Sequence, residues 1–347
     1  MSKARELAEL GAAYDSGALS NRNLIINGGM QVAQRGTSTT ASSQIAFSSP
    51  DRFRFQTNKN SDSVISQVSD APDGFNYSLK ITVGTGATPS GTDFARLYHR
   101  NEGYDAEVFN LGSSSSKAIT LSFYVKSSLT GTFGVTFAGD GNGSFVSSYV
   151  INSANTWEFK TVSIPAGVWT TYNGSTTNGI GFQVAFDLGE GPDRSSAAGY
   201  SASVNSGSMG LTGGTKLIAT SSATWQLTGV QLEVGTEATP FEHRSFGDEL
   251  QKCSRYTIKY TNKPIGICSG ATTISHEIVE LHTKMRATPT VESGATYDVN
   301  AGNAGTVAIS RSAQLTSTDD TINFYNSANN WTTNAACRVT CVLTAEL

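Results

Sequence analysis

The chain has 347 residues, 15% of them charged, and a formal net charge of -4 at pH 7. This length fits about two domains. Because this net charge is small and negative, it does not attract a polyanion, and we expect no nucleic-acid partner. Glycine alone contributes 35 residues, a balance that favours strands and tight turns over long helices. The composition therefore predicts an all-β protein.

Two classes of segment are missing from the sequence. No apolar run approaches the roughly 20 residues that a membrane-spanning helix needs, so we expect no membrane insertion. The opening MSKARELAEL lacks the apolar core and cleavage site of a secretory signal, which predicts synthesis in a cytoplasm. The cysteines are too sparse for a disulfide scaffold and lack a matching pair for a tetrahedral metal site, so we expect buried thiols at Cys253, Cys268, Cys337 and Cys341.

Residues 1–22 form a separate N-terminal segment. Ala4, Leu7, Ala8 and Leu10 recur at helical spacing before Gly11, which predicts one or two turns of helix. Because so short a helix is marginal in water on its own, Leu7 and Leu10 are candidates for docking onto a partner. A frayed terminus is the alternative.

From residue 23, short segments alternate apolar and polar residues and are separated by turn signals such as Asp73-Gly74 and Asn173-Gly174. The predicted strands cover residues 24–27, 47–56, 63–68, 77–83, 94–97, 118–126, 131–137, 145–151, 157–164, 180–188 and 225–234. This many short strands predict a two-sheet β-sandwich over residues 23–245, most simply a jelly roll. Residues 189–217 are rich in Ser, Gly and Ala, which predicts a long surface loop or a subunit contact.

A second β domain is predicted over residues 246–347. Pro240 ends the last strand of the first domain, and residues 247–251 have the acidic start of a short helical turn. Short strand patterns follow at residues 263–269, 275–281, 289–292, 297–299, 306–310, 321–325 and 338–343. They predict a smaller β-sandwich.

Several blocks of sequence, taken in order, carry a resemblance to a known family. They are NLIINGGM from Asn23, Arg35-Gly36, Asp51–Phe53, GVQLEVG from Gly229, ATPFEHR from Ala238, Glu249-Leu250, CSRY from Cys253 and KMRATPT from Lys284. This ordered set resembles tail-fibre and related virion proteins of tailed bacteriophages. The strands at 118–126, 157–164 and 225–234 are also similar to the sandwiches of carbohydrate-binding modules.

The resemblance implies a jelly-roll domain and a small β module, assembled as a homotrimer in the virion and made in the host cytoplasm. The implied role is structural and not enzymatic: a tail fibre or appendage that attaches to the host surface through glycans or a protein receptor. Other tail or capsid proteins would be its partners, held through Leu7 and Leu10. Two alternatives stay open, a capsid or neck decoration protein without receptor contact and a depolymerase of surface glycans.

Aromatic side chains on loops are the candidates for glycan binding, because sugar rings stack on them while amides and carboxylates bind the hydroxyls. The candidates in turn-rich segments are Tyr98, Tyr104, Trp169, Tyr172, Tyr200 and, in the second domain, Trp331. Ordinary packing is the alternative for each. Trp157 and Trp225 lie in predicted strands at positions where the resemblance implies core, so we expect both to be buried.

Asp187, Glu190 and Asp193 cluster at the end of a predicted strand. Carboxylates grouped in this way suit calcium ligation or acid-base catalysis, although their spacing is not that of an EF-hand loop and a surface turn is the alternative. His276–Glu280 begins like the zinc-protease motif but has glutamate in place of the second histidine. We expect no cofactor, calcium at these carboxylates excepted, and no enzymatic activity.

Overall fold

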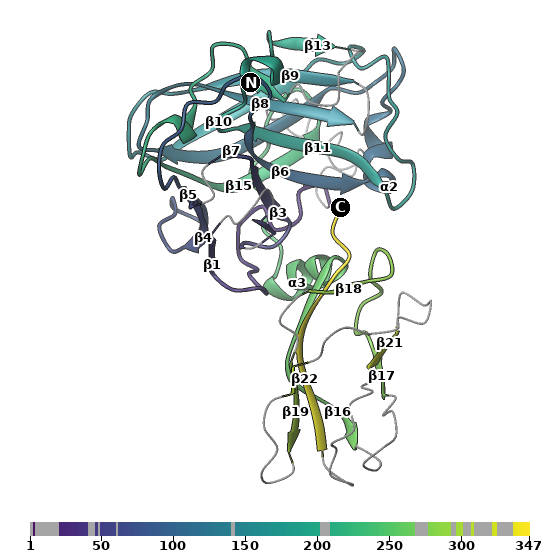
Figure 1. Ribbon diagram of the computed structural model, residues 1–347. Coiled ribbons are helices and arrows are strands. Elements are labelled where there is room, and N and C mark those ends of the chain that lie inside the picture. Colours follow the sequence, from purple (N-terminus) through teal and green to yellow (C-terminus); the bar gives the residue numbers. More distant parts are fainter. Residues whose placement is uncertain are drawn as a thin grey trace. The chain divides into compact units, whose positions relative to one another are not determined.

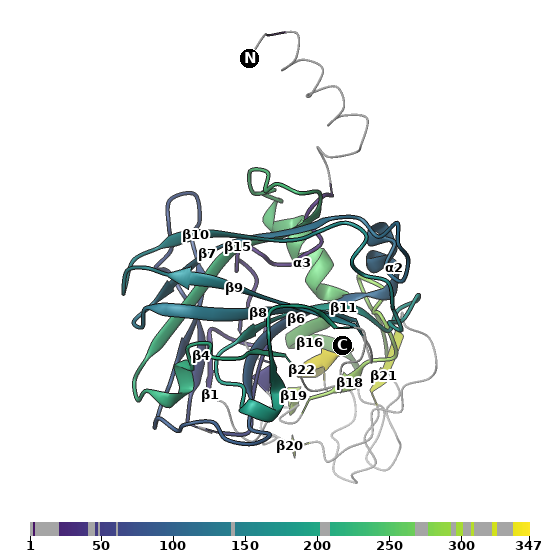
Figure 2. The ribbon, with the colours of Figure 1, turned by 90° about the horizontal axis from the view of Figure 1, so that it is seen from above.

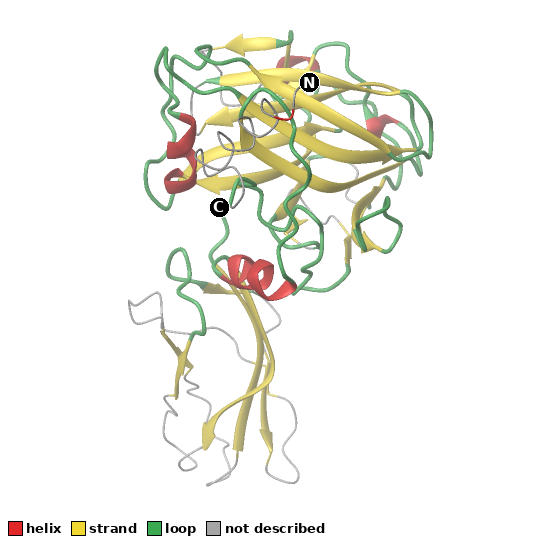
Figure 3. Cartoon of the chain, turned by 180° about the vertical axis from the view of Figure 1, so that it is seen from behind, coloured by secondary structure: helices red, strands yellow, loops and turns green. Residues whose placement is uncertain are grey.

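The structure is a computed structural model that describes residues 3, 21–40, 46–47, 49–59, 62–139, 143–201, 209–267, 277–292, 296–300, 307–308, 321–324 and 336–347. Strands dominate it (Figure 3), which confirms the all-β class. The chain forms two compact units, one of Met1–Phe246 with Leu347 and one of Gly247–Glu346. Of the predicted N-terminal helix only Lys3 is described, as helical, and Leu7 and Leu10 lie outside the described residues.

The first unit is a β-sandwich of two sheets, which Figures 1 and 2 show as separate layers. The six-stranded sheet runs in the order β1 (Ser38–Thr40), β4 (Val64–Val68), β5 (Ser78–Thr82), β15 (Thr224–Val234), β7 (Ile119–Ser127) and β10 (Glu158–Ile164). The seven-stranded sheet runs in the order β13 (Gly199–Ser201), β9 (Ser144–Ile151), β8 (Gly131–Gly139), β11 (Ile180–Asp187), β6 (Ala95–Glu102), β3 (Phe53–Thr57) and β2 (Ala46–Phe47).

Short elements connect these strands. They are α2 (Gly103–Ala106), η1 (Glu107–Phe109), η2 (Pro192–Arg194), η3 (Leu217–Ala219) and the parallel pair of β12 (Ser195–Ser196) and β14 (Gly210–Leu211). The described parts of the predicted 189–217 loop thus carry five small elements, counting β13. This loop also contributes to the core, because Leu217 is fully buried.

The core lies between the two sheets and is rich in aromatic rings. On β7, Leu121, Phe123 and Val125 alternate into it. Trp225 of β15 is fully buried, as predicted, and its indole Nε1 donates to the hydroxyl of Tyr149 at 3.2 Å. Because apolar burial contributes about 25 cal/mol per Å², these large side chains supply much of the stability of the sandwich.

The second unit begins with α3 (Phe246–Ser254) and continues in strands. Its larger sheet holds β16 (Thr257–Ile267), β22 (Ala336–Thr344), β19 (Thr296–Asn300), β20 (Val307–Ala308) and β18 (Thr290–Val291), and a separate ladder pairs β17 (Glu277–Glu280) with β21 (Thr321–Phe324). The described part of the zinc-protease-like segment, Glu277–Glu280, is strand β17. Cys253 and Cys341 are buried free thiols, as predicted, whereas the side chains of Cys268 and Cys337 lie outside the described part.

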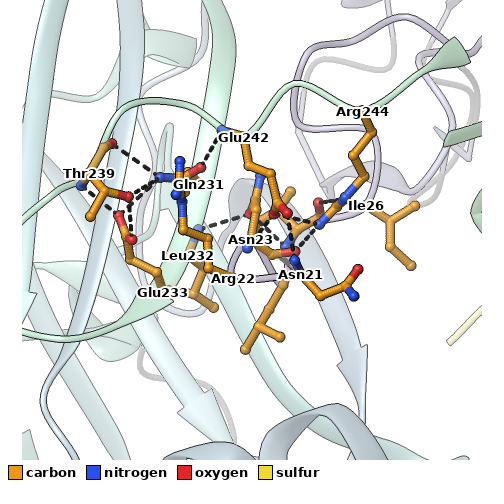
Figure 4. A network of polar contacts seen from close by, with 12 residues as sticks. Asn21, Arg22, Asn23, Ile26, Gln231, Leu232, Glu233, Thr239, Glu242 and Arg244 are labelled. Atoms are coloured by element: carbon orange, nitrogen blue, oxygen red, sulfur yellow. Dashed lines mark hydrogen bonds and ion pairs between the residues drawn. The ribbon is translucent and has the colours of Figure 1, made fainter. Parts of the chain in front are cut away.

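The predicted strand at 24–27 is wrong, and a buried side chain explains why. Asn23 holds this segment against β15: its Nδ2 donates to the carbonyl of Val230 at 3.1 Å, and its Oδ1 accepts the N–H groups of Ile25 at 2.9 Å and Leu232 at 3.1 Å (Figure 4). A turn follows, in which a Cβ on Gly28 would lie 2.1 Å from the carbonyl oxygen of Val230. Only glycine allows this approach.

Three further side chains in Figure 4 connect this segment to residues 231–244. The Glu242 carboxylate accepts the N–H groups of Asn21 at 2.6 Å and Asn23 at 2.8 Å, and the Glu242 N–H donates to Oε1 of Gln231 at 2.8 Å. Arg244 donates to the carbonyl of Asn23. We call Asn23, Gln231, Glu242 and Arg244 the polar clasp. Its four residues lie within the sequence blocks from Asn23, Gly229 and Ala238, and they bind the N-terminal segment to β15 and to the residues after it.

His99 of β6 is a second buried polar group that holds the N-terminal segment. Its Nε2 accepts the N–H of Ile26 at 3.3 Å, so Nδ1 carries the proton and donates to Oδ1 of Asn101 at 3.3 Å. Burial, and then the positive charge of Arg52, hold the pKa of His99 well below its usual value. The imidazole is therefore neutral in the folded protein at neutral pH.

The free energy of unfolding of the first unit is expected to fall as the pH drops below about 6.5, the ordinary pKa of histidine. Below that pH the unfolded chain protonates His99 and the folded chain does not, so acid favours the unfolded state, by up to about 1.4 kcal/mol per pH unit. Urea unfolding between pH 7.5 and 5 checks this, with His99→Gln as the comparison. Identical pH slopes in the two proteins would contradict the prediction.

Candidate functional site

The structure places Trp169 in the core and not on a binding surface. It is 1% exposed, and its ring centroid lies 5.7 Å from that of Phe182 and 5.5 Å from that of Tyr200. With both ring faces covered, no sugar can stack on it. The prediction that Trp169 binds a glycan is therefore wrong, and its role is packing.

The other predicted aromatic residues do not form one site. Tyr200 is half-buried, and its hydroxyl accepts the N–H of Thr171 at 3.0 Å. Tyr172 is also half-buried and donates to the carbonyl of Ser175 at 2.9 Å. Tyr172 is thus held by a residue three positions further along the chain, and Tyr200 by the distant Thr171, whereas Tyr104 is 58% exposed. Trp331 lies outside the described residues.

The predicted carboxylate cluster does not form an ion cage. Asp187 is fully buried and pairs with Nζ of Lys216 at 2.8 Å, and Glu190 pairs with Nε of Arg96 at 2.7 Å. Burial raises the pKa of Glu190 to about 8, although Arg96 opposes the shift. Asp193 is exposed. Each of the two buried acidic side chains thus pairs with a basic side chain and not with the other acidic residues.

The outer face of the six-stranded sheet carries a row of aromatic rings that the sequence analysis missed. Phe159 of β10 lies opposite Tyr124 of β7, with ring centroids 5.0 Å apart. Phe75 follows at 5.6 Å from Tyr124, and Phe241 and His243 lie 5.0 and 5.4 Å from Phe75. Phe159 is 50% exposed and His243 is exposed. We call these five residues the aromatic row.

The alternation of side chains along the strands, together with one glycine, determines where the rings of the aromatic row lie. On β7 the core side chains are at odd positions, so Tyr124 points to the other face. On β10 the buried residues Val162 and Ile164 are at even positions, so the odd-numbered Phe159 points to the outer face, as Tyr124 does. Gly229, at a bulge in β15 with φ of 61°, leaves room for Phe75: a Cβ there would lie 2.7 Å from the Phe75 ring.

Polar groups surround Trp157 next to the aromatic row. Trp157 is half-buried, which corrects the expectation that it lies in the core. Its Nε1 donates to Asp70 at 3.3 Å, and Nζ of Lys126 lies 5.6 Å from its ring centroid. Asp70 also accepts Nζ of Lys126 at 2.6 Å and Nε2 of Gln226 at 2.9 Å. We call these four residues the Trp157 cluster.

The carboxylate of the Trp157 cluster stays ionised and reachable. Burial works against ionisation, but the hydrogen bonds from Lys126 and Trp157 hold the pKa of Asp70 below its usual value. The side chain of Asp70 is 49% exposed. The face therefore combines flat apolar rings with an accessible carboxylate and a partly exposed ammonium group, which can recognise the faces and hydroxyls of sugars.

Two searches of the described residues concern other classes of site. No group of three or more His, Cys, Asp or Glu there is placed to hold a metal ion. Among the same residues, none of the helices has the length and hydropathy needed to cross a bilayer.

Comparisons with known proteins gave no family model and no curated protein that matches the chain. Among solved structures, the enzymatically active domain of bacteriophage CBA120 tailspike protein 4 is 12% identical with a TM-score of 0.32, and the alignment covers 62% of this chain and 22% of that one. The N-terminal cellulose-binding domain of Cellulomonas fimi β-1,4-glucanase C is 15% identical with a TM-score of 0.31, covering 60% of this chain and 100% of that one. A family 61 carbohydrate-binding module solved with β-1,4-galactotriose is 10% identical with a TM-score of 0.31, covering 62% and 100%. At TM-scores this low, any function has to be argued from the chain's own residues.

Proposed function

We propose that this chain is a non-catalytic attachment protein of a tailed-phage virion, and that it holds host-surface glycans on the outer face of its six-stranded sheet. One observation carries the proposal: the aromatic row lies beside the Trp157 cluster on a face with exposed rings. The virion role is supported by the ordered sequence blocks that resemble tail-fibre proteins. No cofactor is needed for such binding.

Binding would combine stacking with hydrogen bonds. The rings of Phe159 and Tyr124 adjoin one another across two strands, so successive sugar rings can lie along them. The exposed carboxylate of Asp70 lies on the same face and can accept hydrogen bonds from sugar hydroxyls, while buried Gln226 holds it in place. Because the strands hold these side chains in place before binding, little conformational entropy is lost.

A weak site of this kind suits attachment by many copies at once. A homotrimer in the virion would present three such faces, and many trimers on one particle would raise avidity without a strong single contact. The second unit and residues 1–22 are then available for contacts with other virion proteins.

Replacing Phe159 by alanine is expected to weaken glycan binding roughly tenfold, or by about 1.4 kcal/mol, because a stacking surface is lost. The measurement is titration of the purified chain against oligosaccharides released from the host surface. Val150→Ala is the matched control, since Val150 is a similarly exposed apolar side chain on β9 of the other sheet. It should bind as the wild type does.

Three results would decide against the proposal. Equal losses in the Phe159 and Val150 variants would remove the aromatic row as the site. If the purified chain fails to compete with phage for adsorption, and particles lacking it are fragile, it is a decoration protein. Release of sugar fragments during the titration would make it a depolymerase.

A further inference from the structure

Strands β6 and β11 are neighbours in the seven-stranded sheet (Figure 1). A second group of polar side chains lies on these two strands. Tyr98 and Arg100 alternate with the inward residues Leu97 and His99, so both lie on the face of β6 opposite the core. Tyr98 and Gln183 are 3% and 6% exposed, so only the half-buried Arg100 reaches the surface there. Arg100 lies directly opposite Gln183 of β11 in the strand register. Neither the polar clasp nor the aromatic row uses these residues.

The guanidinium of Arg100 is held in one orientation. Its Cζ lies 4.6 Å from the centroid of the Tyr98 ring, and its Nε donates to Oε1 of Gln183 at 3.2 Å. The Cζ of Arg54 lies 5.5 Å from the same ring centroid, so a second positive charge is close. Because the Arg100 side chain is already ordered and half-buried, it loses little entropy when a ligand binds.

The groups of Arg100 and Gln183 that make no hydrogen bond to a described residue are donors. Within the described residues, the two terminal nitrogens of Arg100 make no hydrogen bond and Arg100 forms no ion pair. Since Oε1 of Gln183 accepts from Arg100, its amide nitrogen carries two further N–H groups, which also bond to no described residue. A cationic fork beside an amide donor fits a planar carboxylate, which Arg binds through two parallel hydrogen bonds.

We infer that Arg100 and Gln183, with the Tyr98 ring beside them, form a subsite for the carboxylate of an acidic sugar residue. Arg100 binds the carboxylate with its two terminal nitrogens, and the Gln183 amide donates to one of its oxygens. This subsite is on a different sheet from the aromatic row and so adds a second contact with the surface polysaccharide. The identification of the ligand as a glycan rests on the proposed function. The preference for a carboxylate rests only on the contacts of Arg100 and Gln183.

The test compares oligogalacturonate with a neutral galactose oligomer of equal length, by titration of the full chain at low and physiological salt. The wild type should bind the acidic oligomer at least tenfold more tightly. Arg100→Ala and Gln183→Glu should remove this preference. The carboxylate introduced by Gln183→Glu would itself pair with Arg100 and occupy the fork, so this isosteric variant keeps the fold while blocking the anion. Lys117→Ala removes one exposed positive charge elsewhere and should keep the preference.

The outcomes separate this subsite from the aromatic row. Phe159→Ala should weaken both oligomers equally and leave their ratio unchanged. If neither oligomer binds the wild type, the proposed function fails. The subsite is then tested by titration with free galacturonate. Binding that Gln183→Glu abolishes supports the subsite, and lack of binding overturns it. An unchanged preference in Gln183→Glu overturns it. Inorganic phosphate that binds at Arg100 more tightly than galacturonate overturns the assignment to a carboxylate.

Discussion

Replacing Asn23 by alanine is expected to lower the free energy of unfolding of the first unit by about 3 to 5 kcal/mol. The side chain is 4% exposed and makes three hydrogen bonds, to the carbonyl of Val230 and from the N–H groups of Ile25 and Leu232. Alanine leaves one acceptor and two donors buried without those partners, and each such group costs about 1 to 3 kcal/mol. Urea unfolding followed by tryptophan fluorescence measures the loss.

Asn173→Ala is the matched control for this substitution. Asn173 is exposed and lies in a loop of the same unit, so its removal should change the free energy of unfolding by less than about 0.5 kcal/mol. A loss below about 1 kcal/mol for Asn23→Ala would show that the segment relaxes and finds other partners. The polar clasp would then not be what fixes the N-terminal segment to β15.

The strands themselves could be predicted from the sequence, because each is a local pattern. The alternation of Leu121, Phe123 and Val125 predicts β7 within one residue at each end, and β15 is predicted as closely. The segment at 24–27 has the same local pattern but is no strand. Asn23, which holds it, finds partners 207 and 209 residues further along the chain, and no local pattern reports such contacts.

The candidate site could be predicted only in part. The even-numbered Tyr124 among odd-numbered core residues is a signal that an aromatic ring faces outward on β7, and Phe159 is out of step with Val162 in the same way. Neither signal says that the two rings meet, because that depends on the register of β10 with β7. The pairing of Arg100 with Gln183 likewise depends on which strands are neighbours.

The sequence predicts the wrong environment for two tryptophans. Trp169 follows a turn-rich stretch, which is typical of the surface, yet it packs under Tyr200 against Phe182. Trp157 adjoins a strand, which is typical of the core, yet it lies on the outer face beside Lys126. Irregular segments have no periodicity from which burial can be read, so only tertiary contacts decide between these environments.

These two tryptophans give the second large prediction. Trp169→Ala is expected to lower the free energy of unfolding by about 3 to 5 kcal/mol, since it opens a cavity in the core. Trp157→Ala should cost less than about 1.5 kcal/mol, because the side chain is half-buried and its one hydrogen bond is to the accessible carboxylate of Asp70. Urea unfolding of both variants measures the difference.

Glycan binding should show the reverse order. At a temperature where both variants stay folded, Trp157→Ala should weaken binding roughly tenfold, because the Trp157 cluster loses its ring and the donor that orients Asp70. Trp169→Phe, which keeps most of the buried volume, should bind as the wild type does. If the Trp169 variant loses binding while the Trp157 variant keeps it, the ligand lies at the turn near Tyr200, and the outer face of the six-stranded sheet has another use.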